Sequence, residues 1–199
     1  MKGKYRFTRL AAHPNRLGLA VPPHLEGDNI ICDLTPVVQQ FSQLIMSSNS
    51  YIWSRAGHLQ SYNQKEKAQQ NPMRAIKGDE SPLSYLQAAV CYRELQQYSY
   101  YKDMQWDSQR ILDDQYIDKM TRLGLWPFKK MIRSLDPIFF YDPLHHPVVI
   151  FYTYQSTDGE SIIKHLHRFD YEGYELKTHS RMIASNDESS FIWNRIGFN

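Results

Sequence analysis

Two histidines one residue apart, His165 and His167, have the spacing that most directly suggests chemistry. Residues two apart on a β-strand point to the same side of the sheet, so both imidazoles would project together as two ligands of one metal ion. Catalytic zinc sites use three protein ligands, and His145, His146 or a carboxylate from the helices would have to supply the third. The sequence does not identify which of these it would be.

The alternative interpretation is that the two histidines belong to the core. In that case they are neutral and partly buried, and hydroxyl groups satisfy their ring nitrogens, namely those of Tyr152, Thr178 and Ser180. We favour this interpretation because no third ligand can be named. A divalent metal ion is therefore the cofactor only in the alternative, and otherwise we expect none.

A resemblance to a known family includes the same histidines. Gly159, five residues, His165-Leu166-His167, four residues and Glu172 follow one another. This spacing resembles the first sequence motif of the cupin family, and the resemblance implies a small β-barrel that binds a metal through the two histidines and the glutamate. His179 stands where that motif has its closing glycine, and no second motif follows. We therefore do not assign the chain to that family.

A second metal-dependent pattern involves carboxylates. Glu175-Leu176-Lys177, with Asp142 or Asp158 upstream, fits the loose Glu-x-Lys pattern of metal-dependent nucleases, in which carboxylates hold Mg²⁺ and the lysine assists the attacking water. The tripeptide is common by chance. The chain has no Gly-x-Ser-x-Gly elbow, no phosphate loop and no Gly-x-Gly-x-x-Gly motif. We therefore favour a non-catalytic protein, with a metal-dependent hydrolase or nuclease using His165 and His167 as the alternative.

Three consecutive antiparallel strands must position these residues. The segments are β-branched or alternating and end at turns rich in Asp and Gly, which predicts strands over 147–154, 161–169 and 174–182. A two-residue loop at Asp158-Gly159 would set the register. It pairs Ile163 with Tyr154, His165 with Tyr152 and His167 with Ile150. A four-residue second turn would pair Arg168 with Glu175.

That register divides the sheet into a core face and a basic sheet face. The core face would contain both histidines. The other face would combine cations with a few apolar residues: Val149, Phe151, Lys164, Leu166, Arg168, Glu175, Lys177, His179 and Arg181. Such a face can hold a phosphate backbone or another anionic surface, or it can be an ordinary solvated face. We predict partner binding at Lys164, Arg168, Lys177, His179 and Arg181.

Helical signals dominate the chain before residue 136. Cap-plus-proline pairs at Thr35-Pro36 and Ser81-Pro82 predict two helices. A third would run from about residue 107 to Gly124, and a short fourth over 126–135. The sequence therefore predicts one α+β domain over 1–199, in which a helical N-terminal two-thirds (about 29–135) packs on a C-terminal antiparallel β-meander sheet (about 138–198).

Two further segments are candidates for contact with a partner. The end of the second helix is unusually aromatic, and Tyr100, Tyr101 and Trp106 would offer a large contact area at low entropic cost. Residues 60–81 are rich in Gln, Asn and Lys, which favours an exposed loop over part of this range.

Bulk properties narrow the class of protein further. The formal charge of +2 over 199 residues is too small to indicate nucleic-acid binding by itself. Cys32 and Cys91 have no metal-type spacing, and no apolar run is long enough to span a membrane. We expect a cytoplasmic binding or regulatory protein without membrane contact, whose partner is a protein or a nucleic acid. The sequence leaves the oligomeric state open.

Overall fold

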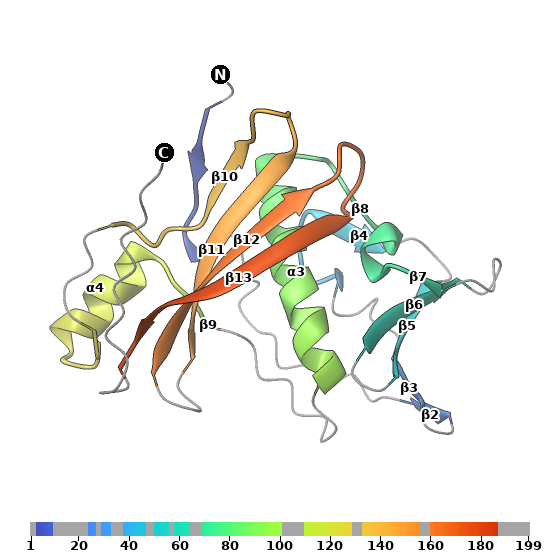
Figure 1. The fold of residues 1–199 in the computed structure, drawn as a ribbon, viewed down its shortest axis with the longest axis horizontal. Helices are drawn as coiled ribbons and strands as arrows, with labels where there is room; N and C mark the ends of the chain where they lie inside the picture. The colour runs from blue at the N-terminus through green and yellow to red at the C-terminus, as the bar shows by residue number, and fades with distance from the viewer. Residues whose placement is uncertain are drawn as a thin grey trace.

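The structure, a computed structural model, describes residues 3–9, 24–26, 29–32, 38–46, 50–55, 58–63, 69–100, 110–128, 133–155 and 160–186. These residues form mostly antiparallel sheet (Figure 1). The α-helices whose bounds are described are α3 and α4.

The central sheet contains the C-terminal strands. Its order is β1-β10-β11-β12-β13, with β9 also paired to β11, and every pair is antiparallel. The bounds of its strands are β1 Tyr5–Arg6, β9 Arg110–Ile111, β10 Ile138–Tyr141, β11 Pro147–Gln155, β12 Ser161–Phe169 and β13 Leu176–Ser185. The predicted antiparallel pairing of the last three strands is confirmed, and β12 has the predicted bounds.

The turn between β12 and β13 is fixed by local chemistry. Gly173 has φ +77°, a conformation that glycine adopts without steric cost. The backbone N–H of Asp170 donates to the carbonyl of Glu175 at 2.9 Å and closes the turn. Phe169 consequently pairs with Leu176, so that His165, His167, Leu176 and Thr178 share one face, as the sequence predicted.

The predicted register between β11 and β12 is wrong by one residue. Ile163 pairs with Thr153, His165 with Phe151 and His167 with Val149. The last pair is Gln155 with Ser161, which leaves residues 156–160 as the connection in place of the two-residue loop. A shift of one residue reverses the faces of a strand. Val149, Phe151 and Thr153 therefore lie on the side of the histidines.

Helix α3 (Pro82–Tyr100) covers that side of the sheet. The Ser81 hydroxyl accepts the backbone N–H of Ser84 at 3.1 Å, which confirms the predicted cap, and Pro82 opens the helix. Tyr85, Leu86, Ala89 and Leu95 of the helix are buried. They belong to the same apolar cluster as Phe139, Val149, Phe151 and Phe169 of the sheet.

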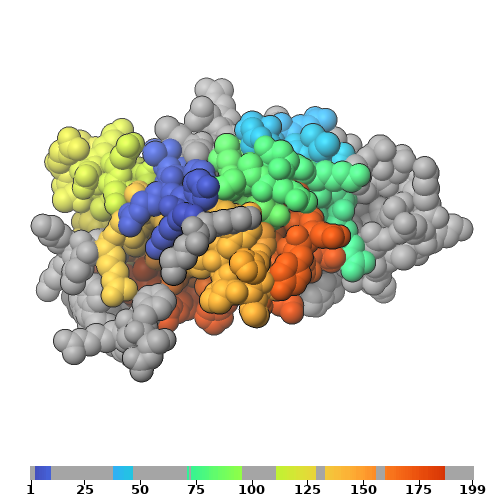
Figure 2. Space-filling view, turned by 90° about the horizontal axis from the view of Figure 1, so that it is seen from above, coloured from blue at the N-terminus to red at the C-terminus, as the bar shows by residue number. Residues whose placement is uncertain are grey.

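A third layer covers the other side of α3. It consists of residues 38–46, the 3-10 helix η1 (Pro72–Ala75) and two paired strands, β4 (Leu44–Met46) and β8 (Ile76–Gly78). Val38, Phe41, Leu44, Met73 and Ile76 are buried in the α3 cluster. Viewed from above, this segment, the helix and the sheet follow one another as layers (Figure 2).

A second apolar cluster lies beside α4 (Asp114–Arg122). The Asp113 carboxylate caps this helix by accepting the N–H of Tyr116 at 2.8 Å, and Gly124 follows its end with φ +67°. The predicted third helix therefore ends where expected, but it begins at Asp114. Leu112, Ile117, Leu135 and Ile162 form the centre of the cluster.

The remaining described strands form another antiparallel sheet, whose backbone order is β2-β3-β5-β6-β7. Its strands are β2 His24–Glu26, β3 Asn29–Cys32, β5 Ser50–Arg55, β6 His58–Asn63 and β7 Gln69–Gln70. In Figure 1 this sheet lies on the far side of α3 from α4.

The predicted fold class is therefore wrong. The range 29–135 is not a helical lobe, because it contributes strands to three sheets as well as α3 and α4. The range 60–81, part of which was expected to be a loop, contains β7, η1, β8 and part of β6, and residues 64–68 lie outside the described residues. The described parts of the predicted fourth helix, 126–128 and 133–135, are not helical, and 129–132 lie outside the described residues.

The first predicted helix is described only in part. Thr35, Pro36 and Val37 lie outside the described residues, Val38 is helical, and residues 39–43 form turns and a bend. Val38, Phe41 and Leu44 are spaced by three residues and are all buried, as a helix would have them. After Val38 the chain continues in consecutive turns, in which Phe41 N donates to Val38 O and Leu44 N to Phe41 O. Such turns bring every third residue to one side, after which Leu44–Met46 pairs with β8 as a strand.

Among the described helices, none is long and apolar enough to cross a membrane.

Candidate functional site

His165 and His167 lie on β12 and point toward α3. Both are buried, and their ring centroids are 6.4 Å apart. The two ring nitrogens of His165 are both engaged. Nε2 is 2.8 Å from the Thr153 hydroxyl and Nδ1 is 2.8 Å from the Ser180 hydroxyl. Ser180 was among the predicted partners, whereas Thr153 replaces Tyr152 because of the register.

His167 has a different environment. Neither ring nitrogen has a hydrogen-bond partner in the described structure. Its ring is held edge-on by Tyr92 of α3, 5.6 Å between centroids, and by Phe151 of β11 at 5.3 Å. The predicted partner Thr178 is opposite His167 across the strands, but it is exposed and makes no bond to the ring.

Burial keeps both imidazoles neutral. Desolvation, with a smaller contribution from Arg93, lowers the pKa of His165 to about 3. The pKa of His167 lies well below its usual value, first because of desolvation and then because of His165 and Arg93. Both residues therefore require an uncharged ring at neutral pH.

The histidines do not meet a third ligand in the described structure. His146 lies in the turn between β10 and β11, where its Nδ1 is 2.9 Å from the Phe169 carbonyl oxygen and its ring packs against Tyr171 at a tilt. His145 is exposed in the same turn. The described part of the chain contains no group of three or more His, Cys, Asp or Glu side chains that could hold a metal ion.

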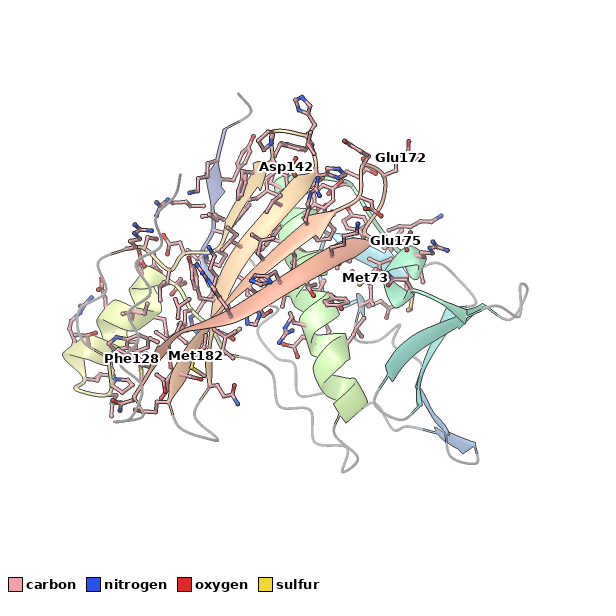
Figure 3. All side chains as sticks on the ribbon, in the orientation of Figure 1. Met73, Phe128, Asp142, Glu172, Glu175 and Met182 are labelled. Atoms are coloured by element: carbon pink, nitrogen blue, oxygen red, sulfur yellow. The ribbon has the colours of Figure 1, made fainter. Side chains whose placement is uncertain are left out.

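The candidate nuclease carboxylates are paired with arginines. Glu175 accepts from Arg74 at 2.8 Å, and Asp142 accepts from Arg168 Nε at 2.8 Å. Both lie at one end of the sheet, as does Glu172, the glutamate of the cupin-like spacing. Met182 lies at the other end (Figure 3). Asp158 lies outside the described residues.

The basic sheet face is the side of β12 and β13 turned away from α3. Cross-strand pairs set its composition: Lys164 faces Arg181, Leu166 faces His179 and Arg168 faces Lys177. The predicted pair between Arg168 and Glu175 does not form. Ile150 and Tyr152 of β11, opposite Leu166 and Lys164, replace the predicted Val149 and Phe151 on this face.

Positive charge concentrates around Lys164. Desolvation is the largest cause of its lowered pKa, and Arg181, Arg133 and Lys4 lower it further. Arg133 and Arg181 also act on the half-buried Tyr152 hydroxyl. No ion pair to these four cations occurs within the described residues. Such a cluster favours an anion beside it.

Two members of this cluster, Lys4 and Arg133, were missed as site residues. Lys4 precedes β1 and Arg133 precedes β10. Both lie near Lys164 because strand pairing brings β1 and β10 into the same sheet as β12. The single sequence signal was the alternation of Lys4 and Arg6 with aromatic residues. No local pattern marks Arg133.

The predicted aromatic contact residues contribute little to the described site. Tyr100 is the last residue of α3, and only its backbone is described. Tyr101 and Trp106 lie outside the described residues. Comparison with protein-family models, with curated proteins and with solved structures finds no match to this chain.

Proposed function

We propose that the protein is a non-catalytic binding protein that holds an anionic partner, a protein or a nucleic acid, on the basic sheet face. The observation that carries this proposal is the register of β12 and β13, which sets Lys164 against Arg181 and Arg168 against Lys177. Like charges directly opposite each other destabilise a sheet. An anion lying over these pairs would turn the repulsion into attraction.

The pair of Lys164 and Arg181 is the centre of this site. Arg168 is already compensated by Asp142. Lys164 has instead three further cations near it and is partly desolvated, so an anion there would be held in a less polar environment than at the free surface. Lys177, His179 and Arg181 are exposed and accessible to a large partner.

The alternative, a metal-dependent hydrolase or nuclease using His165 and His167, has less support. Both nitrogens of His165 already face hydroxyls, and His167 is enclosed by Tyr92 and Phe151. A metal would have to displace these contacts.

We also propose a reducing location such as the cytoplasm, because Cys91 is a free thiol within the core.

Neutralising the central pair should abolish the anionic site. We expect Lys164→Gln/Arg181→Gln to bind a labelled 12-nucleotide oligothymidine and a labelled acidic peptide at least about tenfold more weakly, since each charge-assisted contact is worth ~1.5–3 kcal/mol. Fluorescence anisotropy across a salt series measures this. Phosphate contacts would weaken steeply with ionic strength.

Lys119→Gln/Arg122→Gln is the matched control, because it removes the same charge from the exposed side of α4. It should bind as the unmodified protein does. An equal loss of affinity in both variants would show that binding depends on net charge and not on the central pair. Failure of the unmodified protein to bind either probe would refute the proposed function.

A further inference from the structure

Strand β13 is the outermost strand of the central sheet (Figure 1). Among the described strands it pairs only with β12. Its residues 177–182 are exposed at six consecutive positions, so neither of its faces is covered there. Natural proteins usually shorten or cover an edge of this kind, because its free backbone groups can pair with another strand.

The direction of the free backbone groups follows from the turn. Asp170 N donates to Glu175 O, which makes this a hydrogen-bonded pair. In an antiparallel ladder such pairs alternate with pairs that are not hydrogen-bonded. Lys177, His179 and Arg181 therefore direct their backbone N–H and C=O toward β12.

The intervening residues direct theirs away from the sheet, namely Thr178, Ser180 and Met182. A hydrogen bond on the other side of the sheet agrees with this alternation. The same pattern, continued to β11, directs the backbone groups of Tyr152 away from β12, and the Tyr152 carbonyl accepts the N–H of Leu112 there. Among the described strands nothing pairs with this edge, which therefore presents outward backbone donors and acceptors at three alternate residues.

Charge decides what can occupy this edge. Lys177, His179 and Arg181 lie on the basic sheet face beside Lys164 and Arg168. An added strand of a second copy would bring its own cations beside these, and like charges side by side on neighbouring strands are unfavourable. A strand with acidic residues at alternate positions would complement them. Thr178, Ser180 and Met182 on the opposite side call for small or apolar residues.

We propose that β13 binds an extended acidic segment of a partner protein as an additional strand. Backbone hydrogen bonds to Thr178, Ser180 and Met182 would hold the segment, and its alternate carboxylates would lie beside Lys177 and Arg181. This inference rests on the proposed function, because it uses the same basic face, and it names the partner class as protein.

The test uses a labelled peptide in which Glu alternates with Val and Thr, capped at both ends. In either strand orientation only one alternate set of its backbone amides would face β13. N-methylation of that set should weaken binding at least about tenfold, whereas methylation of the other set should leave it unchanged. Equal effects of the two peptides would overturn the inference.

A protein variant provides the reciprocal test. Thr178→Pro removes one outward N–H without affecting the ladder to β12, and proline is tolerated at such edge positions. We expect this variant to retain its circular dichroism spectrum and to lose peptide affinity at least about tenfold. Thr178→Ala, which keeps the N–H, should lose much less affinity than Thr178→Pro.

The outcomes separate the inference from the proposed function. If oligothymidine binds through Lys164 and Arg181 but the peptide does not, the added strand is refuted and the basic site stands. If the peptide binds equally well after N-methylation of either set and to Thr178→Pro, the added strand is likewise refuted and the basic site stands. Self-association that Thr178→Pro abolishes would replace the acidic partner with a second copy. Binding of neither probe would refute both proposals.

Discussion

At the scale of single residues, the two histidines of β12 differ in what burial costs them. His165 is satisfied by Thr153 and Ser180, whereas His167 is enclosed by aromatic rings and has no hydrogen-bond partner in the described structure. An unsatisfied buried polar group costs stability of about 1–3 kcal/mol. The same two residues, which first suggested a metal site, thus make the core sensitive to pH.

Acid should destabilise the protein through this pair. Both folded-state pKa values lie below the usual value of 6.5, so the unfolded state binds protons first as the pH falls. The stability is therefore fully present above pH 6.5 and declines below it. We expect the free energy of unfolding, from urea titrations, to fall between pH 6.5 and 4.5 by up to ~2.7 kcal/mol per pH unit, about 1.4 for each histidine.

His167→Phe is the informative variant for that prediction. It should halve the slope and raise stability at pH 7, because it removes an unsatisfied group from an aromatic environment. His165→Phe should instead lower stability at pH 7, since Thr153 and Ser180 lose their partner. A flat profile between pH 6.5 and 4.5 would contradict burial of neutral rings.

At the scale of elements, a close contact sets the position of α3. The Tyr174 hydroxyl is 2.7 Å from the Ser84 hydroxyl and accepts the Glu80 N–H at 3.0 Å, which connects the turn after β12 to the start of the helix. Gly78 of β8 lies directly against this hydroxyl. A Cβ there would come within 2.7 Å of the Gln43 carbonyl oxygen and still closer to Tyr174.

Gly78→Ala should therefore destabilise the protein. The Gln43 contact is with backbone and cannot yield by a side-chain rotation, so β4 and β8 would have to separate slightly. We expect a loss of about 1–3 kcal/mol in thermal or urea unfolding. Gly3→Ala is the matched control, because a Cβ at Gly3 meets nothing within 4 Å. Equal stability of the two variants would show that the contact at Gly78 is not tight.

At the scale of the whole molecule, one apolar cluster unites distant parts of the chain. It combines Phe41 and Leu44, the buried side of α3, and Phe151 and Phe169 of the sheet. The prediction of one domain over 1–199 remains a prediction, but this shared cluster provides a way to test it. Cys91 is the natural probe, because it is fully buried within the cluster and burial raises the pKa of its thiol.

Cys91 should resist thiol reagents until the cluster opens. In a Cys32→Ser variant, we expect labelling of Cys91 by a disulfide reagent to follow the same urea dependence as the loss of circular dichroism. That result would mean cooperative unfolding of the helix layer with the central sheet. Labelling at much lower urea would show that the layers separate before the molecule unfolds.

Features that depend on local chemistry could be predicted from the amino-acid sequence. The cap at Ser81-Pro82, the strands β11 to β13, and the glycine after α4 all follow from short-range sterics and hydrogen bonding. The shared face of Lys164, Arg168, Lys177 and Arg181 also follows, because the period of a strand is two and the turn preserves its phase.

The remaining features depend on contacts between distant parts of the chain. The register between β11 and β12 differs by one residue from the predicted one, so that Thr153 and not Tyr152 bonds to His165. Local periodicity does not reveal the register between two strands. After Val38, consecutive turns continue the helical spacing of Phe41 and Leu44, because a turn and a helix both bring every third residue to one side. Lys4 and Arg133 join Lys164 only because sheet pairing brings segments from distant parts of the chain together. The apolar burial that drives this pairing depends on the whole chain and leaves no local signature.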